Sequence, residues 1–372
     1  MVDPGRLEAS AGDVVVLVGT AKGLFTLTSS DRRRWNLNGP WFPGEEIYAA
    51  VLDCRGGRAR LLAGATSSHW GPSIYRSDDL GGSWEEPEPQ TLAFPEGAGA
   101  AVDRVWQIQP AGETEPDLVF AGVEPAALFR SDDAGESFRL DENLWNHEHR
   151  PQWQPGGGGL CLHTILPDPT GGPRLGVAVS AAGFYRTLDG VSWEAANAGI
   201  RAPFLPEPTP KFGQCVHKVD RHPSEPETLF LQHHWGVYRS SDFGGSWDEI
   251  GAESLPSTFG FPIVADPNDP GTAYVVPLTS DMFRCTPDGR LRVYRTTDGG
   301  DSWQALADGL PQENAFLTVL RDSFTADTSD PTGLYLGTRT GDLFASADAG
   351  DSWQELARHL PPVLCVKTAV LR

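Results

Sequence analysis

Short hydrophobic runs, separated by turns rich in Gly and Asp, follow one another along the whole chain. Runs such as Val14–Val18 and Leu24–Leu27 are too short for helices and have the composition of strands. They fall into groups of four, as in the series Val102–Gln109, Leu118–Gly122, Ala127–Ser131 and Phe138–Leu140. The pattern predicts an all-β chain built from small antiparallel sheets.

A motif of the form S/T-x-D-x-G-x-S-W recurs after the third strand of each group. Its clear copies include Ser77–Trp84, Ser240–Trp247 and Ser346–Trp353. Asp can accept hydrogen bonds from backbone amides and Gly can adopt positive φ, so the motif predicts a hairpin turn. Its aspartates, 48 to 56 residues apart, are Asp31, Asp79, Asp133, Asp189, Asp242, Asp298 and Asp348. Such a repeat predicts a seven-bladed β-propeller of four-stranded blades.

The repeated motif resembles the Asp box of the BNR-repeat propellers, a family that includes sialidases, sortilin-type receptors and photosystem-assembly factors. The resemblance covers nearly the whole chain and implies the same fold. It does not select an activity, because one fold can host unrelated functions. Sialidases of the family use a Tyr nucleophile, whereas Tyr48 is the one Tyr here outside the strand positions of the repeat. We therefore expect the fold of the family without typical sialidase chemistry.

The first group of strands lacks an innermost member, because no suitable strand precedes Val14–Val18. A strand-like segment, Val363–Val370, follows the last complete repeat. We expect this segment to become the innermost strand of blade one, which closes the ring and removes a sheet edge. Residues 1–372 are predicted to form a single propeller domain.

The charge balance bears on partners and location. Lys and Arg number 29 and Asp and Glu 50, and the formal net charge of −21 disfavours nucleic acid and anionic membranes as partners. No hydrophobic run approaches the ~20 residues of a membrane span, and the N-terminus lacks the pattern of a secretion signal. The five Cys residues, an odd number, favour reduced thiols. These features predict a cytoplasmic protein and leave its oligomeric state open.

The phrase G-x-C-x-H occurs in the innermost strands of two neighbouring blades, as Gly159–His163 and Gly213–His217. A second phrase, H-W-G, occurs in connections between second and third strands, as His69–Gly71 and His234–Gly236. His233 directly precedes the latter. We expect five histidines to approach the top of the central channel: His69, His163, His217, His233 and His234.

Neutral imidazoles that converge in one cavity are suited to bind a divalent transition metal such as zinc. Two alternatives remain open: the histidines bind an anionic ligand directly, or they are hydrogen-bonded structural residues. Cys161 and Cys215, within the repeated phrase, are expected to pack between blades. No sequence feature indicates an organic cofactor.

Aromatic and charged residues outside the repeat complete the predicted site. The predicted ligand-binding residues are Tyr48, Trp70, Trp106, Trp153 and Trp235. Packing of the loops by their own aromatic side chains is the open alternative. Alignment of the innermost strands places Tyr48, Arg104 and Asp322 level with the two histidines. We predict Arg104 as an anion anchor, Glu124 as a base and Asp322 as a second catalytic carboxylate.

Together these residues predict an enzyme of the hydrolase or lyase type that processes a small molecule or glycan. Metal-assisted chemistry is the first hypothesis, and a metal-free glycosidase that uses Glu124 and Asp322 is the second. The alternative from another class is a non-catalytic binding or assembly scaffold. A scaffold would present a broad apolar surface rather than a cluster of ionisable groups.

Overall fold

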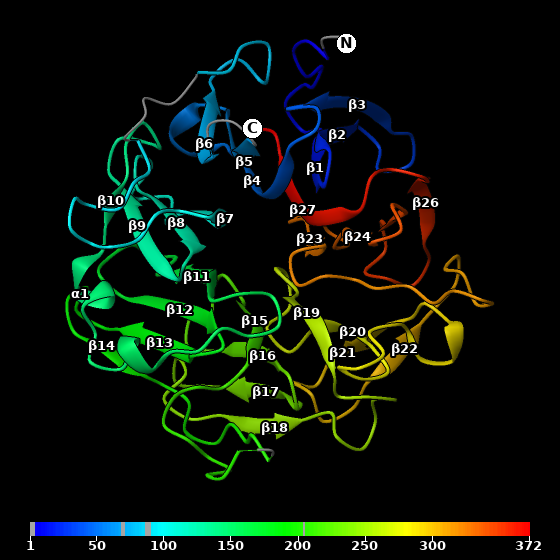
Figure 1. Ribbon diagram of the computed structural model, residues 1–372. Helices are drawn as coiled ribbons and strands as arrows, with labels where there is room; N and C mark the ends of the chain where they lie inside the picture. Colours follow the sequence, from blue (N-terminus) through cyan, green and yellow to red (C-terminus); the bar gives the residue numbers. More distant parts are fainter. Residues whose placement is uncertain (1–3, 68–70, 86–90, 204) are drawn as a thin grey trace. The chain divides into compact units, whose positions relative to one another are not determined.

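The computed structural model describes residues 4–67, 71–85, 91–203 and 205–372 of the chain. These residues form seven antiparallel sheets, of which six have four strands and one has three (Figure 1). Their helical structure is limited to α1 (Glu142–Trp145) and to 3₁₀ turns at Arg55–Gly57, Arg150–Gln152 and Pro287–Gly289. The predicted fold class, an all-β seven-bladed propeller, is confirmed.

Each sheet is built from consecutive strands, apart from the first, which also takes the C-terminal strand. The first four sheets are β27 (Val363–Val370), β1 (Val14–Thr20), β2 (Gly23–Ser29) and β3 (Asn36–Trp41); β4 (Glu46–Asp53), β5 (Arg60–Ser67) and β6 (Gly71–Ser77); β7 (Arg104–Pro110), β8 (Val119–Glu124), β9 (Ala127–Ser131) and β10 (Arg139–Leu140); and β11 (Cys161–Pro167), β12 (Leu175–Ser180), β13 (Gly183–Thr187) and β14 (Trp193–Ala195). The last three are β15 (Val216–Arg221), β16 (Leu229–His233), β17 (Gly236–Ser240) and β18 (Asp248–Ile250); β19 (Gly260–Ala265), β20 (Ala273–Pro277), β21 (Val293–Thr296) and β22 (Gln304–Leu306); and β23 (Phe324–Ala326), β24 (Leu334–Gly337), β25 (Leu343–Ser346) and β26 (Gln354–Ala357).

The C-terminal strand β27 lies next to β1 in the first sheet, as predicted. Backbone bonds continue the pairing beyond the strand. The Gly12 amide donates to the Leu371 carbonyl at 2.7 Å, and the Leu371 amide donates to the Asp13 carbonyl at 2.9 Å. The C-terminal segment therefore covers the edge that β1 would otherwise expose.

The second sheet departs from the predicted four strands. In the described part of the chain it contains β4, β5 and β6, followed by a single bridge between Arg76 and Glu85. The Glu85 amide donates to the Arg76 carbonyl at 2.8 Å. This isolated bridge occupies the position where the prediction placed a fourth strand, and residues 86–90 after it lie outside the described residues.

The chain divides into two compact units. The first contains residues 1–181, 185–194 and 367–372, and the second contains residues 182–184 and 195–366. Each unit has its own buried hydrophobic clusters, with Val15 and Leu61 among the members in the first and Leu334 and Phe344 in the second. The prediction of one domain stays a prediction.

The S/T-x-D-x-G-x-S-W motif folds into the same turn in successive blades. Asp79 accepts hydrogen bonds from the Ser77 hydroxyl and from the amide and hydroxyl of Ser83, all at 2.7–2.8 Å. The bond from the Ser83 amide is the largest cause that lowers the pKa of Asp79 to about 2. Leu80 and Gly81 both have positive φ, so the turn needs two left-handed residues where the motif shows one glycine. The same bonds recur around Asp133, Asp242, Asp298 and Asp348.

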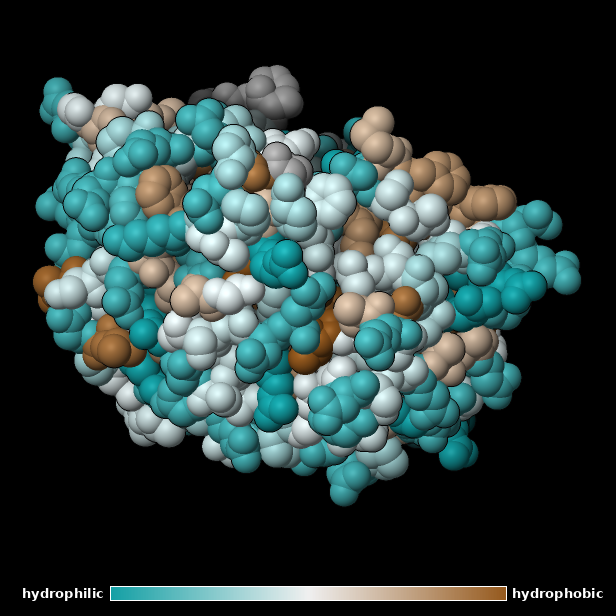
Figure 2. Space-filling view, turned by 90° about the horizontal axis from the view of Figure 1, so that it is seen from below, coloured by the Kyte–Doolittle hydropathy of each residue, from teal (hydrophilic) through white to brown (hydrophobic). Residues whose placement is uncertain are grey.

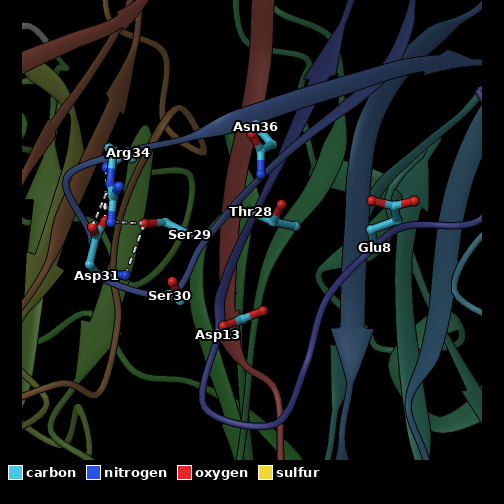
Figure 3. A pocket seen from close by; sticks show the side chains of 8 residues that line it. All are labelled: Glu8, Asp13, Thr28, Ser29, Ser30, Asp31, Arg34 and Asn36. Atoms are coloured by element: carbon cyan, nitrogen blue, oxygen red, sulfur yellow. Dashed lines mark hydrogen bonds and ion pairs between the residues drawn. The ribbon is translucent and has the colours of Figure 1, made fainter.

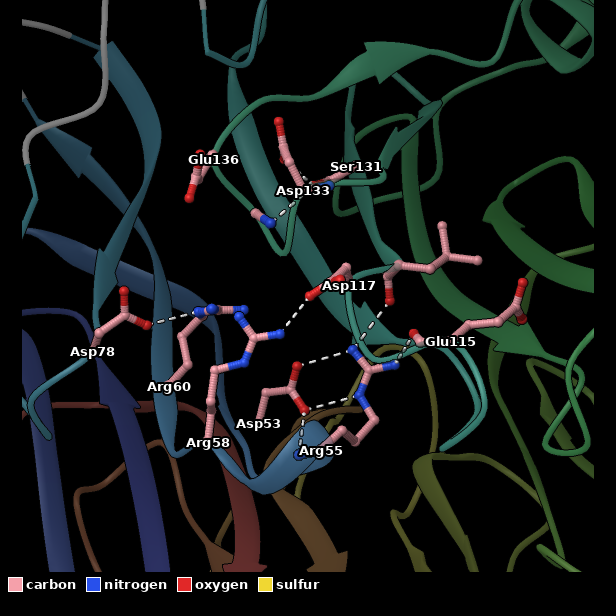
Figure 4. A network of polar contacts seen from close by, with 12 residues as sticks. Asp53, Arg55, Arg58, Arg60, Asp78, Glu115, Asp117, Ser131, Asp133 and Glu136 are labelled. Atoms are coloured by element: carbon pink, nitrogen blue, oxygen red, sulfur yellow. Dashed lines mark hydrogen bonds and ion pairs between the residues drawn. The ribbon is translucent and has the colours of Figure 1, made fainter.

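A buried ion pair fastens two neighbouring blades of the first unit (Figure 4). Arg55, in the turn between β4 and β5, donates to both carboxylate oxygens of Asp53 at 2.8 Å, and both side chains are buried. The guanidinium also donates to carbonyl oxygens in the turn between β7 and β8, which belong to Gly112, Glu115 and Leu118. Because its charge and its donors are matched, we read this network as structural.

Hydrophilic side chains predominate on the face shown in Figure 2, where hydrophobic ones form small separate groups. The described large hydrophobic residues that are exposed are Leu37, Leu188, Val191, Trp235, Met282, Phe283 and Phe316. Leu37 belongs to β3, and the other six lie in several different connections. Among the described residues, no helix is long and apolar enough to cross a membrane.

Candidate functional site

Four innermost strands contain a β-bulge near their N-terminal end. In β4, β7, β11 and β15 the register with the next strand shifts by one residue, which stays unpaired. The unpaired residues are Tyr48, Trp106, His163 and His217. Bulges redirect side chains and are common next to binding sites. These four predicted site residues therefore occupy equivalent positions, each in its own strand.

The bulge of β7 lies at a different residue from the one that the sequence alignment selects. The alignment places Arg104 level with Tyr48 and the histidines. Arg104 is the first residue of β7, and the bulge lies two residues later, at Trp106. In the observed strands, Trp106, His163 and His217 each lie four residues before the last residue of the strand. The alignment was displaced because the predicted strand, Val102–Gln109, begins and ends earlier than β7.

The first unit brings together five charged and aromatic residues, termed the Arg104 cluster: Glu46, Tyr48, Arg104, Trp106 and Glu124. Two different guanidinium nitrogens of Arg104 lie 3.2 Å from Glu124 and 3.4 Å from Glu46. The indole N–H of Trp106 donates to Glu124 at 3.0 Å. The guanidinium carbon is 4.6 Å from the ring centroid of Tyr48 and 5.5 Å from that of Trp106. Glu46 is a member that the sequence analysis missed.

Strand pairing explains how this cluster forms. Arg104 at the start of β7 lies opposite Glu124 at the end of β8, and Glu46 begins β4. The bulges bring the rings of Tyr48 and Trp106 to a centroid distance of 4.7 Å. The side chain of Glu124 is 18% exposed and that of Glu46 is 42% exposed, so one carboxylate is enclosed and the other faces solvent.

A glycine-rich segment, Gly156–Gly159, packs against the enclosed carboxylate. Gly159 has a φ of +101°, and a Cβ there would lie 1.9 Å from Oε1 of Glu124. Only glycine fits this approach without displacing the carboxylate. The run of four glycines was the sequence signal for this contact.

The second unit brings together Cys215, His217 and His234. Their candidate ligand atoms all lie within 4.8 Å of one another, the one such group among the described residues. The two imidazole centroids are 5.3 Å apart. The sequence analysis expects Cys215 to pack between blades, and the one sequence signal for a ligand role is its place two residues before His217 in the G-x-C-x-H phrase.

Burial controls the charge of these imidazoles. It lowers the pKa of His217 well below its ordinary value, although Nδ1 of His217 lies 2.6 Å from the Gly260 carbonyl, which favours protonation. Burial also lowers the pKa of His234, against the opposing effect of Asp281, whose carboxylate is 3.5 Å from Nε2. Both rings are therefore neutral at ordinary pH, the form that metals bind.

His233 directly precedes His234 but has different surroundings. It is fully buried in β16, and its Nδ1 accepts a bond from the Trp235 amide at 3.2 Å. Burial lowers its pKa to about 3. His233 is not a member of the group of three, and its predicted role as a metal ligand stays a prediction.

His163 belongs to the first unit and is fully buried. Its Nδ1 lies 3.0 Å from the hydroxyl of Thr164. His163 is not in the group formed by Cys215, His217 and His234. That His163 and His217 belong to one site stays a prediction. The remaining predicted residues of the H-W-G phrase, His69 and Trp70, lie outside the described residues.

Asp322, predicted as a catalytic carboxylate, forms an ion pair in the second unit. Its carboxylate lies 2.7 Å from Nζ of Lys218, and the side chains are only 4% and 11% exposed. The Asp322 carbonyl also accepts from the Val366 amide at 2.7 Å. These contacts describe a well-paired buried charge, and a catalytic role for Asp322 stays a prediction.

The two remaining predicted Trp residues differ in exposure. Trp153 is buried and donates its indole N–H to the hydroxyl of Tyr185 at 2.8 Å. Trp235 is 41% exposed, and its ring centroid is 5.0 Å from that of His234. Of the two, Trp235 is the one that a ligand from solvent can reach.

A cavity of about 310 Å³ in the first unit lies apart from the predicted site residues (Figure 3). Its lining is polar and comprises Glu8, Asp13, Thr28, Ser29, Ser30, Asp31, Arg34 and Asn36. Asp31 there already bonds the Arg34 side chain and the backbone amides of Arg33 and Arg34. The cavity thus borders the copy of the repeated turn at Asp31, which departs from the full motif. None of its eight lining residues is a predicted site residue.

Comparisons with known proteins agree on the fold. No protein-family model and no curated protein sequence matches the chain. Among solved structures, YCF48 bound to a D1 peptide is similar with a TM-score of 0.54 and 14% identity, over 95% of this chain and 88% of that chain. An ancestral GH74 enzyme gives a TM-score of 0.56 and 15% identity, and a candidate 6-phosphogluconolactonase of Bacteroides uniformis gives 0.56 and 11%.

The extent of these matches varies. The chain is covered to 94% in the match with the GH74 enzyme but spans only 40% of that protein, whereas the Bacteroides uniformis protein is matched over its full length. The neighbours include both enzymes and a peptide-bound propeller. At these identities the likeness establishes the fold alone. The relation to the Asp-box family rests only on the resemblance of the repeated motif.

Proposed function

We propose that the protein is a glycan-processing hydrolase whose substrate binds at the Arg104 cluster of the first unit. The observation that carries this proposal is the position of the guanidinium, which lies over two aromatic rings and contacts two carboxylates. Aromatic faces with a few convergent polar groups are typical of small-molecule sites. Here the polar groups offer both donors and acceptors to sugar hydroxyls.

The charge of the cluster favours a neutral sugar over an acidic one. One guanidinium faces two carboxylates, so an incoming carboxylate would meet net negative charge unless it displaced Glu46. This is also a reason to expect no sialidase activity, in agreement with the sequence.

The two carboxylates are suited to different roles. Glu124 accepts hydrogen bonds from both Arg104 and Trp106, which fix the direction of its carboxylate and suit a base or nucleophile. Glu46 is more exposed and contacts Arg104 at a longer distance, 3.4 Å, so its carboxyl can turn towards the leaving group, and we assign it the role of general acid. Glycoside hydrolysis uses such a pair of carboxylates. On these contacts Glu46 replaces Asp322 as the proposed partner of Glu124.

The test measures binding and cleavage of cellotetraose and xylotetraose, with N-acetylneuraminic acid as an acidic probe. We expect a neutral tetrasaccharide to bind, Trp106→Ala to weaken its binding by about tenfold, and Glu124→Gln to slow its cleavage by about 100-fold or more while binding persists. Glu194→Gln is the matched control, because Glu194 also pairs with an arginine of the first unit, Arg186, but at the surface.

Three outcomes decide the proposal. Failure of both neutral probes to bind, or binding that Trp106→Ala leaves unchanged, contradicts it. Binding without cleavage by the wild-type protein contradicts the hydrolase and assigns a non-catalytic carbohydrate-binding role.

A further inference from the structure

The backbone of one blade sets the positions of Cys215, His217 and His234. Cys215 directly precedes β15, His217 is the bulged residue of that strand, and His234 begins the turn between β16 and β17. The His234 amide donates to the Cys215 carbonyl at 3.1 Å, which fixes the turn against the strand. The three side chains are thus positioned by the backbone of one blade.

The next blade fixes the tautomer of His217. Its Nδ1–H donates to the carbonyl of Gly260, the first residue of β19, at 2.6 Å. This bond leaves the lone pair on Nε2, and a backbone carbonyl behind a histidine is a usual outer partner of a metal ligand. Asp281 stands 3.5 Å from Nε2 of His234 in the corresponding outer position.

The donor set selects the kind of ion. One thiolate and two imidazoles suit zinc, whereas magnesium and calcium require oxygen ligands. Structural zinc sites use four protein ligands, and catalytic ones use three and leave a position for water or substrate. We infer that Cys215, His217 and His234 bind one zinc ion whose fourth position is open to water or a small ligand.

The surroundings agree with an accessible ion. His217 is buried, but Cys215 and His234 are only partly so. Phe259 and Phe261 form the inner wall, with ring centroids 5.5 and 4.9 Å from that of His217. An apolar wall on one side and solvent access on the other are what a ligand-exchanging site needs. This inference does not depend on the carbohydrate proposal, since its residues belong to the second unit and its test detects a metal.

The test uses the full chain without a histidine tag, stripped of metal by a chelator and titrated with Co²⁺ and then Zn²⁺. We expect one equivalent of Co²⁺, with tetrahedral visible bands and a near-ultraviolet thiolate-to-cobalt band, both removed by one equivalent of Zn²⁺. Cys215→Ser should abolish the thiolate band, and Cys215→Ser and His234→Ala should each weaken zinc binding by about 100-fold or more.

The matched control is Cys161→Ser, which changes the cysteine of the other G-x-C-x-H phrase and should leave binding intact. His234 is partly exposed, so His234→Ala keeps the test valid if a variant at buried His217 fails to fold. The inference is overturned by wild-type protein that binds no Co²⁺, by a thiolate band that survives in Cys215→Ser, or by equal loss of binding in Cys161→Ser.

Discussion

The two copies of G-x-C-x-H place the same residue types on the same kind of strand but in different surroundings. His163 and His217 are both bulged residues of an innermost strand. The turn that follows the second strand of the blade supplies His234 beside His217, whereas the corresponding turn between β12 and β13 begins with Ala181. The ring of His163 has the hydroxyl of Thr164 at Nδ1, and that of His217 has the carbonyl of Gly260. A repeated phrase therefore places its residues at equivalent positions in two strands. The neighbouring segments decide whether these residues become part of a group of metal ligands.

The two copies should differ most in how much the residue after each histidine contributes to the free energy of unfolding. Lys218→Met removes the cation that pairs with Asp322, whose side chain is only 4% exposed. Removal of the cation beside a buried carboxylate is costly, so we expect the free energy of unfolding to fall by about 3–5 kcal/mol, measured by denaturant titration. The double variant Lys218→Met/Asp322→Leu should recover most of this loss. Equal losses in the single and double variants would show that the pair is not what stabilises this region.

Thr164→Val is the corresponding change in the first copy. It removes the hydroxyl 3.0 Å from Nδ1 of His163 in a fully buried position, and we expect a loss of about 1–2 kcal/mol in thermal or denaturant unfolding. Zinc binding should be unchanged, because His163 is outside the group of three. Lower zinc affinity in Thr164→Val would break the comparison and bring His163 into the metal site.

The turn motif provides the opposite case, in which copies have the same surroundings and should behave alike. Asp79→Ala and Asp242→Ala should each lower the free energy of unfolding by about 1 kcal/mol, since each removes the same turn bonds. Unequal effects, or loss of ligand binding without loss of stability, would contradict a purely structural role.

The pH dependence gives the smallest effect and has a defined sign. The folded state lowers the pKa of Asp79 to about 2, from an unfolded value near 4. Its contribution is therefore present above about pH 4 and is lost as the pH falls towards 2. The stability difference between wild type and Asp79→Ala should shrink over that interval, as measured by urea unfolding at each pH. A difference that stays constant from pH 5 to 2 would mean that the carboxylate charge is not involved.

The sequence was sufficient for the fold because the evidence for it is periodic. Turn motifs, strand groups and the unpaired first strand together predicted the seven blades and the position of β27. In the described part of the second sheet, the single bridge Arg76–Glu85 in place of a fourth strand was not predictable, since one bridge has no hydrophobic signature.

The candidate sites were only partly predictable. The sequence identifies Tyr48, Arg104, Trp106 and Glu124 as site residues, and the structure brings them together. Glu46 was missed because nothing in its local sequence distinguishes it from a surface carboxylate. Cys215 was missed as a ligand because the deciding neighbour, His234, comes from another strand connection and the bulge at His217 is invisible in hydrophobic alternation.

The central claim is that the second copy of the phrase, with His234, forms a metal centre. X-ray absorption at the zinc edge of the untagged, zinc-loaded protein tests it most directly. The account predicts one sulfur at about 2.3 Å and nitrogen or oxygen ligands at about 2.0–2.1 Å, with the sulfur lost in Cys215→Ser and retained in Cys161→Ser. A spectrum without sulfur in the wild-type protein, or one that Cys215→Ser leaves unchanged, would contradict it.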